Sequence, residues 1–304
     1  MIPILPEYQN IAIIINPKAR RGMVYPQVRK RLETVLRDLR IQAEWLETQG
    51  PGHATELARR LRSEAIDMLL VAGGDGTVNE VVNGWLGHTV PIGILPIGTS
   101  NILARVYGIR GSLEGACIRV FYGKPRPIPV GQANGRYFVL MAGVGLDGEV
   151  VAVTTPEQKL RWNRLAYAWH ALRLALRPCP YELRVYPLDG EDLLMKATQV
   201  IVTLVPNYGG FFRIIPPQWL AGHPMWAVGF QKNRWWNYTK YCLLAIPGWH
   251  VRLPDVVTLQ VSEGLRIEST PACTPVQVDG EAVGSTPVRV RLVDATVRLV
   301  TPAF

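Results

Sequence analysis

One loop in the sequence has residue types suited to phosphate chemistry. Residues 73–77 read Gly-Gly-Asp-Gly-Thr and follow the buried-type run 68–72. Glycines let backbone N–H groups approach a phosphate closely, and the N-terminus of the helix predicted to start near Thr77 favours negative charge. Asp75 would repel a phosphate unless Mg²⁺ lies between them. A tight turn capped by Asp75 or Thr77 is the alternative interpretation, and the Asn79-Glu80 that follows favours the phosphate loop.

Three further polar segments follow strands that are predicted to be parallel neighbours. In an open parallel sheet, ligands bind outside the carboxyl ends of the strands, so these segments are expected to line one nucleotide pocket with residues 73–77. The alternatives are a solvated basic turn for residues 16–22 and a plain helix start for residues 96–101. The candidates are Asn16, Pro17, Lys18, Ala19 and Arg20 after the first strand, Thr48 after the second, and Gly98, Thr99 and Asn101 after the fourth.

The elements that would position these loops alternate strand with helix through the first part of the chain. Apolar runs at 11–15, 68–72 and 92–95 predict strands, the segment 43–47 is predicted to be another, and apolar residues at helical spacing between them predict helices. Strand–helix alternation with short links predicts a parallel sheet with right-handed crossovers. We therefore expect an α/β domain whose sheet edge carries the nucleotide pocket.

The pattern changes after Pro125, Pro127 and Pro129. Strand patterns with turn dipeptides such as Asp279-Gly280 predict an antiparallel β-sandwich, interrupted by helices over 157–176 and 235–246. The predicted domains are residues 1–127 and 128–304, and the last strand, about 295–304, could return to the first domain. The strands of the second half are predicted at 137–142, 181–186, 199–205, 256–261, 288–293 and 296–300.

Composition excludes several classes of protein. The chain has 304 residues, 48% of them hydrophobic and 19% charged, which excludes an intrinsically disordered chain. Its four cysteines lie far apart, so neither a disulfide framework nor a zinc ribbon is expected. No leader or membrane-spanning run is recognised, and we expect a cytoplasmic protein. The formal net charge of +9 favours acidic partners without selecting one.

The ordered set of motifs resembles the diacylglycerol kinase catalytic-domain family, which includes bacterial lipid kinases and sphingosine kinases. The resemblance spans nearly the whole chain, although the Gly-Gly-Asp-Gly-Thr loop is shared with NAD kinases. Its motifs are Asn16-Pro17, Thr48 with 52–54, 73–77 with Asn79-Glu80, 96–101, 143–147 and 278–281.

The resemblance implies ATP bound in a cleft between a Rossmann-like nucleotide-binding domain and a β-sandwich domain. It also implies transfer of the γ-phosphoryl group of ATP to a lipid hydroxyl with Mg²⁺. Asp75 would engage the metal, Asp279 or Glu281 would accept the hydroxyl proton, and Asp147 would anchor the lipid head group. A plain hairpin is the alternative for residues 276–284, since Asp-Gly is a favoured turn. The residues implied to line the nucleotide are Asn16, Thr48, Gly74, Asp75, Gly76, Thr77, Val78, Asn79, Glu80 and Thr99.

The sequence departs from the family at three acidic positions, where it has Ile102, Pro129 and the segment around Ala221. Two hypotheses follow. Either ATP and Asp75 hold the metal in an active kinase, which we favour because the other carboxylates are present, or the chain is a weakened lipid- or nucleotide-binding module. An NAD kinase-like enzyme with a soluble acceptor is a third alternative. The acceptor and the oligomeric state stay open, a homodimer included.

Basic and aromatic residues occur together in segments 158–177 and 230–252. Such segments suit the anionic inner face of a membrane, and the alternative is that both helices pack their apolar stripes on the second sheet. Nucleic acid is not an expected partner, because no recognised binding motif appears.

Overall fold

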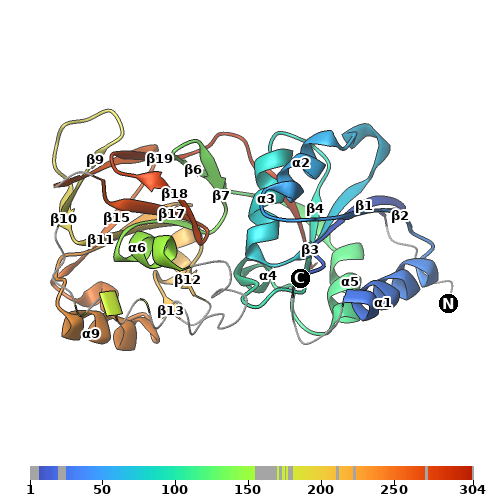
Figure 1. Cartoon of the computed structure of the whole chain (residues 1–304), viewed down its shortest axis with the longest axis horizontal. Helices are drawn as coiled ribbons and strands as arrows, with labels where there is room; N and C mark the ends of the chain where they lie inside the picture. The colour runs from blue at the N-terminus through green and yellow to red at the C-terminus, as the bar shows by residue number, and fades with distance from the viewer. Residues whose placement is uncertain are drawn as a thin grey trace. The chain divides into compact units, whose positions relative to one another are not determined.

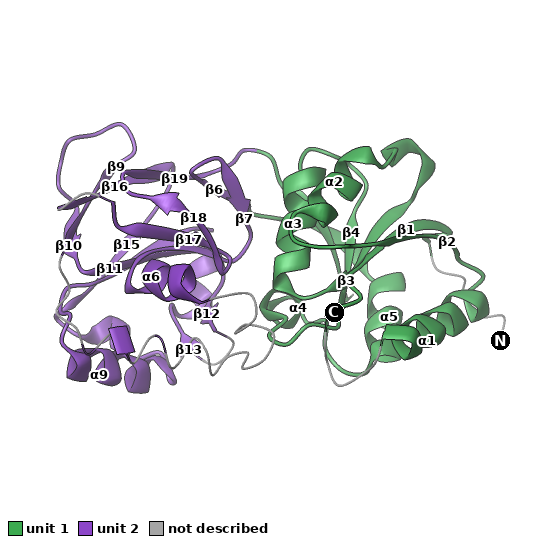
Figure 2. Cartoon of the chain, in the orientation of Figure 1, with its two compact units in different colours: residues 1–129, 295–304 green, residues 130–294 purple. Residues whose placement is uncertain are grey.

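The structure is a computed structural model of the chain, and it describes residues 7–19, 25–154, 170, 173–174, 176, 181–209, 212–221, 224–270 and 273–302. The chain divides into two compact units, residues 1–129 with 295–304 and residues 130–294 (Figure 2). The chain thus returns to the first unit with its final strand. Most of the helix predicted over 157–176 lies outside the described residues.

A six-stranded sheet forms the centre of the first unit. Its strand order is β2-β1-β3-β4-β20-β5, and all pairings are parallel except β20 with β5. Strands β1, β3 and β4 are almost wholly buried, which explains their continuous apolar sequences. The strands are β1 (Asn10–Ile15), β2 (Gln42–Glu47), β3 (Met68–Gly73), β4 (Ile92–Pro96), β5 (Lys124–Ile128) and β20 (Val297–Thr301).

Helices cover both faces of this sheet. Figure 1 shows α2 and α3 on one face and α1 and α5 on the other. The direction of strand order reverses between β1 and β3, and such a switch point is where open α/β sheets bind ligands. The helices are α1 (Tyr25–Asp38), α2 (His53–Arg60), η1 (Ser63–Ala65), α3 (Asp75–Trp85), α4 (Ile102–Val106) and α5 (Leu113–Phe121).

The second unit is a sandwich of two six-stranded antiparallel sheets. One sheet has the order β10-β9-β16-β19-β6-β7 and the other β15-β14-β11-β8-β17-β18. The first consists of β10 (Met195–Ala197), β9 (Glu182–Pro187), β16 (Gly264–Thr270), β19 (Val288–Leu292), β6 (Gly131–Ala133) and β7 (Arg136–Phe138). The second consists of β15 (Val256–Gln260), β14 (Trp226–Phe230), β11 (Gln199–Thr203), β8 (Met141–Gly145), β17 (Pro275–Val278) and β18 (Glu281–Ser285).

Alternating side chains from both sheets fill the core of the sandwich. Val185, Ile267 and Val290 of one sheet and Val202 and Val276 of the other belong to the same fully buried cluster. Outside the sheets lie α6 (Leu146–Val153), the short strands β12 (Asn207–Tyr208) and β13 (Phe212–Arg213), η2 (Pro217–Ala221), α9 (Trp235–Ala245) and η3 (His250–Arg252).

One predicted strand is divided in the structure. The segment 137–142 becomes the end of β7 and the start of β8, with a corner between Phe138 and Met141. At this corner the N–H groups of Val139 and Leu140 donate to the carboxylate of Asp279. A side-chain acceptor from a distant turn therefore ends one strand and allows the next to begin.

Candidate active site

The Gly-Gly-Asp-Gly-Thr loop joins the buried strand β3 to α3. Gly74 is the N-cap residue, with φ −97° and ψ −176°, and no side chain caps this helix end. The helix begins at Asp75, two residues before the predicted start. The first N–H groups of any α-helix have no acceptor within it, and its N-terminus carries partial positive charge. This loop therefore presents the features that attract a phosphate.

The loop after β4 packs directly against it. Gly98 N–H donates to Gly73 O over 3.3 Å, and a β-carbon added at Gly98 would overlap the Cα atom of Gly74. The structure thus brings the two glycine loops together at the carboxyl ends of β3 and β4. Of the predicted residues here, Thr99 is exposed, whereas Val78 is buried and faces the interior.

The Asp75 carboxylate links the two loops. Its Oδ2 accepts from Ile102 N–H at 3.0 Å and its Oδ1 from Leu103 N–H at 3.2 Å, at the first turn of α4. Asp75 therefore caps α4, which follows the next strand, and not its own helix α3, as the alternative weighed from the sequence had it. An ionised carboxylate oxygen can accept more than one bond, so this role does not use up the acceptor capacity of Asp75.

Asn101 shapes the second loop from within. It has the left-handed conformation, with φ 46°, and its Nδ2 donates to Pro96 O at 3.1 Å and Gly98 O at 2.7 Å. Its Oδ1 is buried and has no hydrogen-bond partner among the described residues. A buried unsatisfied acceptor is unfavourable by about 1–3 kcal/mol, so this atom suits a ligand or water that donates to it.

Asn16 connects the end of β1 to the glycine loop. Its N–H donates to Ala72 O at 3.0 Å, its Nδ2 to Thr77 Oγ1 at 3.3 Å, and its Oδ1 accepts from Lys18 N–H at 2.9 Å. This contact bridges the switch point between β1 and β3. Thr77 leaves no room for a side chain at residue 73, where a β-carbon would lie 2.6 Å from Thr77 Cβ.

The remaining predicted residues of the basic turn lie at the same sheet edge. Pro17 and Ala19 are half-buried and Lys18 is exposed, while Arg20 lies outside the described residues. Thr48 follows β2, and its N–H donates to Ile15 O at 2.9 Å.

Glu80 and Asn79 are buried on the inner side of α3. Glu80 Oε2 accepts from Ala54 N–H at 3.1 Å, in the first turn of α2, and Thr55 Oγ1 donates to Glu80 O at 2.8 Å. These bonds fasten α2 to α3. The structure therefore gives Glu80 a positioning role, which the sequence motif alone did not indicate.

The predicted carboxylates of the second unit lie on the β17–β18 hairpin, as expected for Asp-Gly. Asp279 accepts from three backbone N–H groups, those of Val139, Leu140 and Met141, at 2.8–3.0 Å. Glu281 accepts from Arg136 Nη2 at 2.8 Å, and its side chain is 39% exposed. Asp279 thus stabilises the corner between β7 and β8, whereas the Glu281 carboxylate forms an ion pair with a side chain.

Asp147 is enclosed by polar groups of its own unit. Its Oδ2 accepts from Gln277 Nε2 at 2.6 Å, its Oδ1 accepts from the Tyr208 hydroxyl, and the residue is 5% exposed. Gln277 Oε1 in turn accepts from Gly280 N–H at 2.8 Å, which connects Asp147 to the hairpin. Sequence reasoning missed Tyr208, Gln277 and Arg136, and a glutamine at an inward position of β17 was the available signal.

Comparisons with known proteins agree with this architecture. A family model described as the diacylglycerol kinase catalytic domain matches residues 10–133. A second, described as the YegS C-terminal NAD kinase beta sandwich-like domain, matches residues 141–301. The chain therefore belongs to the diacylglycerol kinase catalytic-domain family, a family of lipid kinases, which confirms the resemblance and the kinase class predicted from the sequence.

Relatives and solved structures match over most of the chain. The diacylglycerol kinase of Bacillus subtilis (strain 168) is 29% identical over 290 residues, 90% of each chain. That of Staphylococcus carnosus (strain TM300) is 27% identical over 295 residues, 95% of this chain and 94% of its own. A crystal structure of a diacylglycerol kinase from Bacillus anthracis str. Sterne has a TM-score of 0.76 and 21% identity, covering 97% of this chain and 98% of that one. The predicted fold class, an α/β domain followed by an antiparallel β-sandwich domain, is confirmed.

The link between Asp75 and α4 yields a first prediction. We expect Asp75→Ala to lower the free energy of unfolding by about 1–2 kcal/mol, because it removes the acceptor for two N–H groups. Urea denaturation measures this, with Asp192→Ala at an exposed position as the control. Equal stability of Asp75→Ala and the wild type would contradict the capping role.

The buried network around Asp147 gives a pH-dependent prediction. Burial raises the pKa of Asp147, and it outweighs the hydrogen bonds from Tyr208 and Gln277, which act to lower that pKa. A carboxyl with a raised pKa binds its proton more tightly in the folded state, so its stabilising contribution is present below the ordinary pKa of ~3.9 and is lost as the pH rises through the raised value.

Asp147→Asn replaces the titrating carboxyl with an amide that stays neutral at every pH, so the variant lacks this contribution. The stability of the wild type relative to the variant should therefore rise as the pH falls from 7 towards 4. Chemical denaturation across that range measures this difference. A difference independent of pH would exclude titration of Asp147.

Proposed function

We propose that the protein is an ATP- and Mg²⁺-dependent lipid kinase that transfers the γ-phosphoryl group of ATP to the hydroxyl of a diacylglycerol-like lipid. The observation that carries the proposal is the pair of glycine loops fastened together at the carboxyl ends of β3 and β4. The family membership supports a lipid acceptor, and the relatives that match about nine-tenths of the chain are named diacylglycerol kinases. An NAD kinase-like function has support only from the description of the sandwich domain.

The residues of the first unit fit a nucleotide. The N-terminus of α3 would hold phosphate oxygens through backbone N–H groups, with Asn16 fixed beside it by Thr77. The unsatisfied Oδ1 of Asn101 would accept from an N–H or O–H group of the nucleotide, which a phosphate oxygen could not supply. Two different kinds of ligand group would thus find partners on the two loops.

The metal would be held mainly by the nucleotide. The described residues contain no group of three or more His, Cys, Asp or Glu side chains placed to hold a metal ion. Asp75 is the carboxylate of the glycine loop, and its oxygens can accept beyond their bonds to α4. When bound, Mg²⁺ would neutralise charge on the phosphates of ATP. The buried Ile102, next to this carboxylate, brings no second ligand.

Glu281 is the residue that we assign to accept the proton of the lipid hydroxyl. Its ion pair with Arg136 orients the carboxylate, and its exposure lets a hydroxyl approach. Asp279, by contrast, would hold the corner between β7 and β8 through its three N–H donors. This assignment selects one of the two carboxylates that the sequence left open.

The experiment is transfer of label from γ-³²P-ATP, with Mg²⁺, to a panel of acceptors resolved by thin-layer chromatography. The panel contains dioctanoylglycerol, a sphingoid base, ceramide, phosphatidylglycerol, an isoprenoid alcohol and NAD. We expect label in dioctanoylglycerol. Label in NAD alone, or in no acceptor although ATP binds, would reject the proposal.

The same assay tests the proton acceptor. We expect Glu281→Gln to lower turnover by ~100-fold or more with unchanged ATP affinity, which is the usual scale for a general base. Glu191→Gln, at a 91% exposed side chain of the same unit, is the matched control. Full turnover by Glu281→Gln would leave the hairpin a purely structural element.

A further inference from the structure

Helix α9 of the second unit turns large apolar side chains towards solvent. Amphipathic surface helices ordinarily bury such residues, yet the buried positions of α9 are Asn237, Tyr241 and Ala245. Two exposed tryptophans and a leucine lie on its outer side instead, and an isoleucine and a third tryptophan follow at its end. This set, which we call the α9 surface, is Trp235 (49% exposed), Trp236 (47%), Leu243 (62%), Ile246 (55%) and Trp249 (57%).

The exposed apolar residues of the α9 surface are clustered in the sequence. Its five residues fall within fifteen positions, although the described chain has only eleven large hydrophobic residues that are exposed. The sequence-based alternative, in which this helix packs its apolar residues on the sheet, holds for Tyr241, whose ring centre lies 4.9 Å from that of Phe230 in β14, but not for the α9 surface. None of the helices in the described part of the chain is long and apolar enough to cross a bilayer.

Polar bonds on the inner side fix the orientation of this helix. Tyr241 donates its hydroxyl to Asp255 Oδ2 at 2.7 Å, and Lys240 Nζ lies 3.0 Å from the same oxygen. At the end of α9, His250 Nε2 lies 3.0 Å from Ile214 O. The apolar residues are therefore held outward by the way the helix is bonded to its unit.

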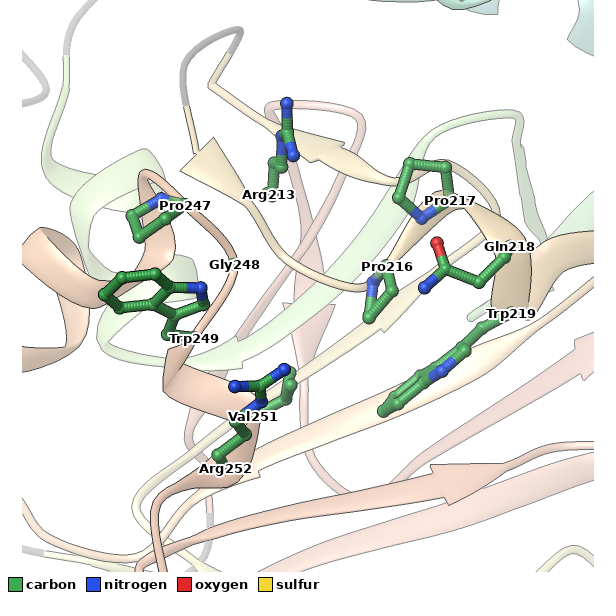
Figure 3. Close-up of a pocket in the computed structure, with 10 residues that line it drawn as sticks. All are labelled: Arg213, Pro216, Pro217, Gln218, Trp219, Pro247, Gly248, Trp249, Val251 and Arg252. Atoms are coloured by element: carbon green, nitrogen blue, oxygen red, sulfur yellow. The ribbon is translucent and has the colours of Figure 1, made fainter.

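A basic pocket of about 360 Å³ adjoins the α9 surface (Figure 3). Trp249 and Arg252 line it from one side, and Gln218 and Trp219 line it from the other, with Arg213 on the adjoining strand β13. The described residues that line the pocket include no carboxylate. Among the ion pairs formed by the described residues, none includes Arg213 or Arg252.

Two more cations flank the N-terminal end of the helix. The guanidinium of Arg234 lies 5.0 Å from the ring centre of Trp236, and Lys232 is 62% exposed. The carboxylate near them, Asp255, is only 4% exposed; it lies 3.9 Å from Lys232 Nζ and is also bonded to Lys240 and Tyr241. The outer surface here combines exposed indole rings with positive charge.

We infer that the α9 surface docks on an anionic lipid bilayer and that the pocket between Arg213 and Arg252 takes the phosphate of a lipid head group. Tryptophan rings prefer the membrane–water interface, and each basic residue near an anionic surface adds attraction. The inference deepens the proposed function and rests on it for the acceptor being a membrane lipid.

Charge complementarity favours a bilayer over a second copy of the chain. A two-fold interface places the same patch on both partners, so Arg213 and Arg252 would face identical cations. An anionic bilayer supplies the opposite charge to the arginines and an apolar layer to the indoles.

The test is co-sedimentation with vesicles of phosphatidylcholine alone or with one-quarter phosphatidylglycerol. The wild type should bind the anionic vesicles and lose affinity as salt is added. The double variant Arg213→Ala with Arg252→Ala should weaken this binding by ~10-fold or more. Each basic residue near an anionic surface contributes roughly tenfold or less to the affinity, so two are removed together. Trp236→Ser with Trp249→Ser should weaken it similarly.

Matched controls make the same chemical changes elsewhere. Arg62→Ala with Arg289→Ala removes two exposed arginines, and Leu193→Ser with Leu194→Ser removes two exposed apolar residues. Because all substituted side chains are exposed, thermal unfolding should match the wild type. The inference would be overturned if vesicle binding survived in both the arginine pair and the tryptophan pair, or if it fell equally in the controls.

Two further readouts separate this inference from other outcomes. A tryptophan pair that abolishes a dimer in sedimentation velocity while vesicle binding persists would assign the surface to self-association. Inorganic phosphate that binds the wild type but not the arginine pair, without any vesicle binding, would assign the pocket to a soluble anion. Either result overturns bilayer docking.

Kinase assays keep the docking inference distinct from the proposed function. The two pairs of variants should phosphorylate dispersed dioctanoylglycerol at the wild-type rate but long-chain diacylglycerol in anionic vesicles more slowly. Vesicle binding without phosphorylation of any lipid would reject the proposed function and leave docking in place. Phosphorylation in vesicles that neither pair impairs would reject docking alone.

Discussion

The contact on which the candidate site depends is the pair of hydrogen bonds from the α4 backbone to the Asp75 carboxylate. Asp75 belongs to the first turn of α3, whereas Ile102 and Leu103 follow the next strand. The loops at the ends of β3 and β4 are also joined by the pairing of Gly73 with Pro96 and by the close approach of Gly98 to residues 73 and 74. The Asp75 carboxylate adds to these contacts by fixing the first turn of α4 against the N-terminus of α3, while Asn101 and Asn16 are held by their own bonds to the loops.

Other carboxylates also accept hydrogen bonds from the backbone N–H groups of distant segments. Glu80 caps the first turn of α2, Asp67 accepts from the N–H groups of Gln9 and Asn10, and Asp279 collects three N–H groups at a strand corner. An ionised oxygen that accepts from backbone N–H groups forms stronger hydrogen bonds than neutral pairs do. These contacts join segments that are distant in sequence.

Because these carboxylates stabilise the fold, their presence supports an active kinase less strongly than the sequence suggested. The sequence favoured an active kinase because Asp75, Asn79, Glu80, Asp279 and Glu281 are all present. In the structure, Asp75, Glu80 and Asp279 accept hydrogen bonds that stabilise the fold, and a binding module would need these bonds as well. Glu281, whose half-buried side chain is paired with Arg136, is the carboxylate that we propose for catalysis.

Periodicity predicted most elements of the first unit, because buried parallel strands are continuous apolar runs and their helices are amphipathic. It could not predict α6, whose sequence from Leu146 to Val153 has no clear polar face, nor β5, whose prolines are tolerated because it is an edge strand. The identity of the candidate site residues was predictable from motifs. Their partners were not, because the bonds of Asp75 to α4, Asp147 to Tyr208, and Asp279 to the β7–β8 corner depend on tertiary packing.

The measurement that tests the account most directly is calorimetric titration of ATP, with Mg²⁺, into the wild type and two glycine variants. Gly98→Ala forces the two loops apart, whereas Gly50→Ala adds a methyl group that meets nothing within 4 Å. We expect saturable binding to the wild type and Gly50→Ala, and affinity lower by ~10-fold or more, about 1.4 kcal/mol, in a folded Gly98→Ala. Equal affinity in all three proteins would contradict the claim that these loops form the nucleotide site.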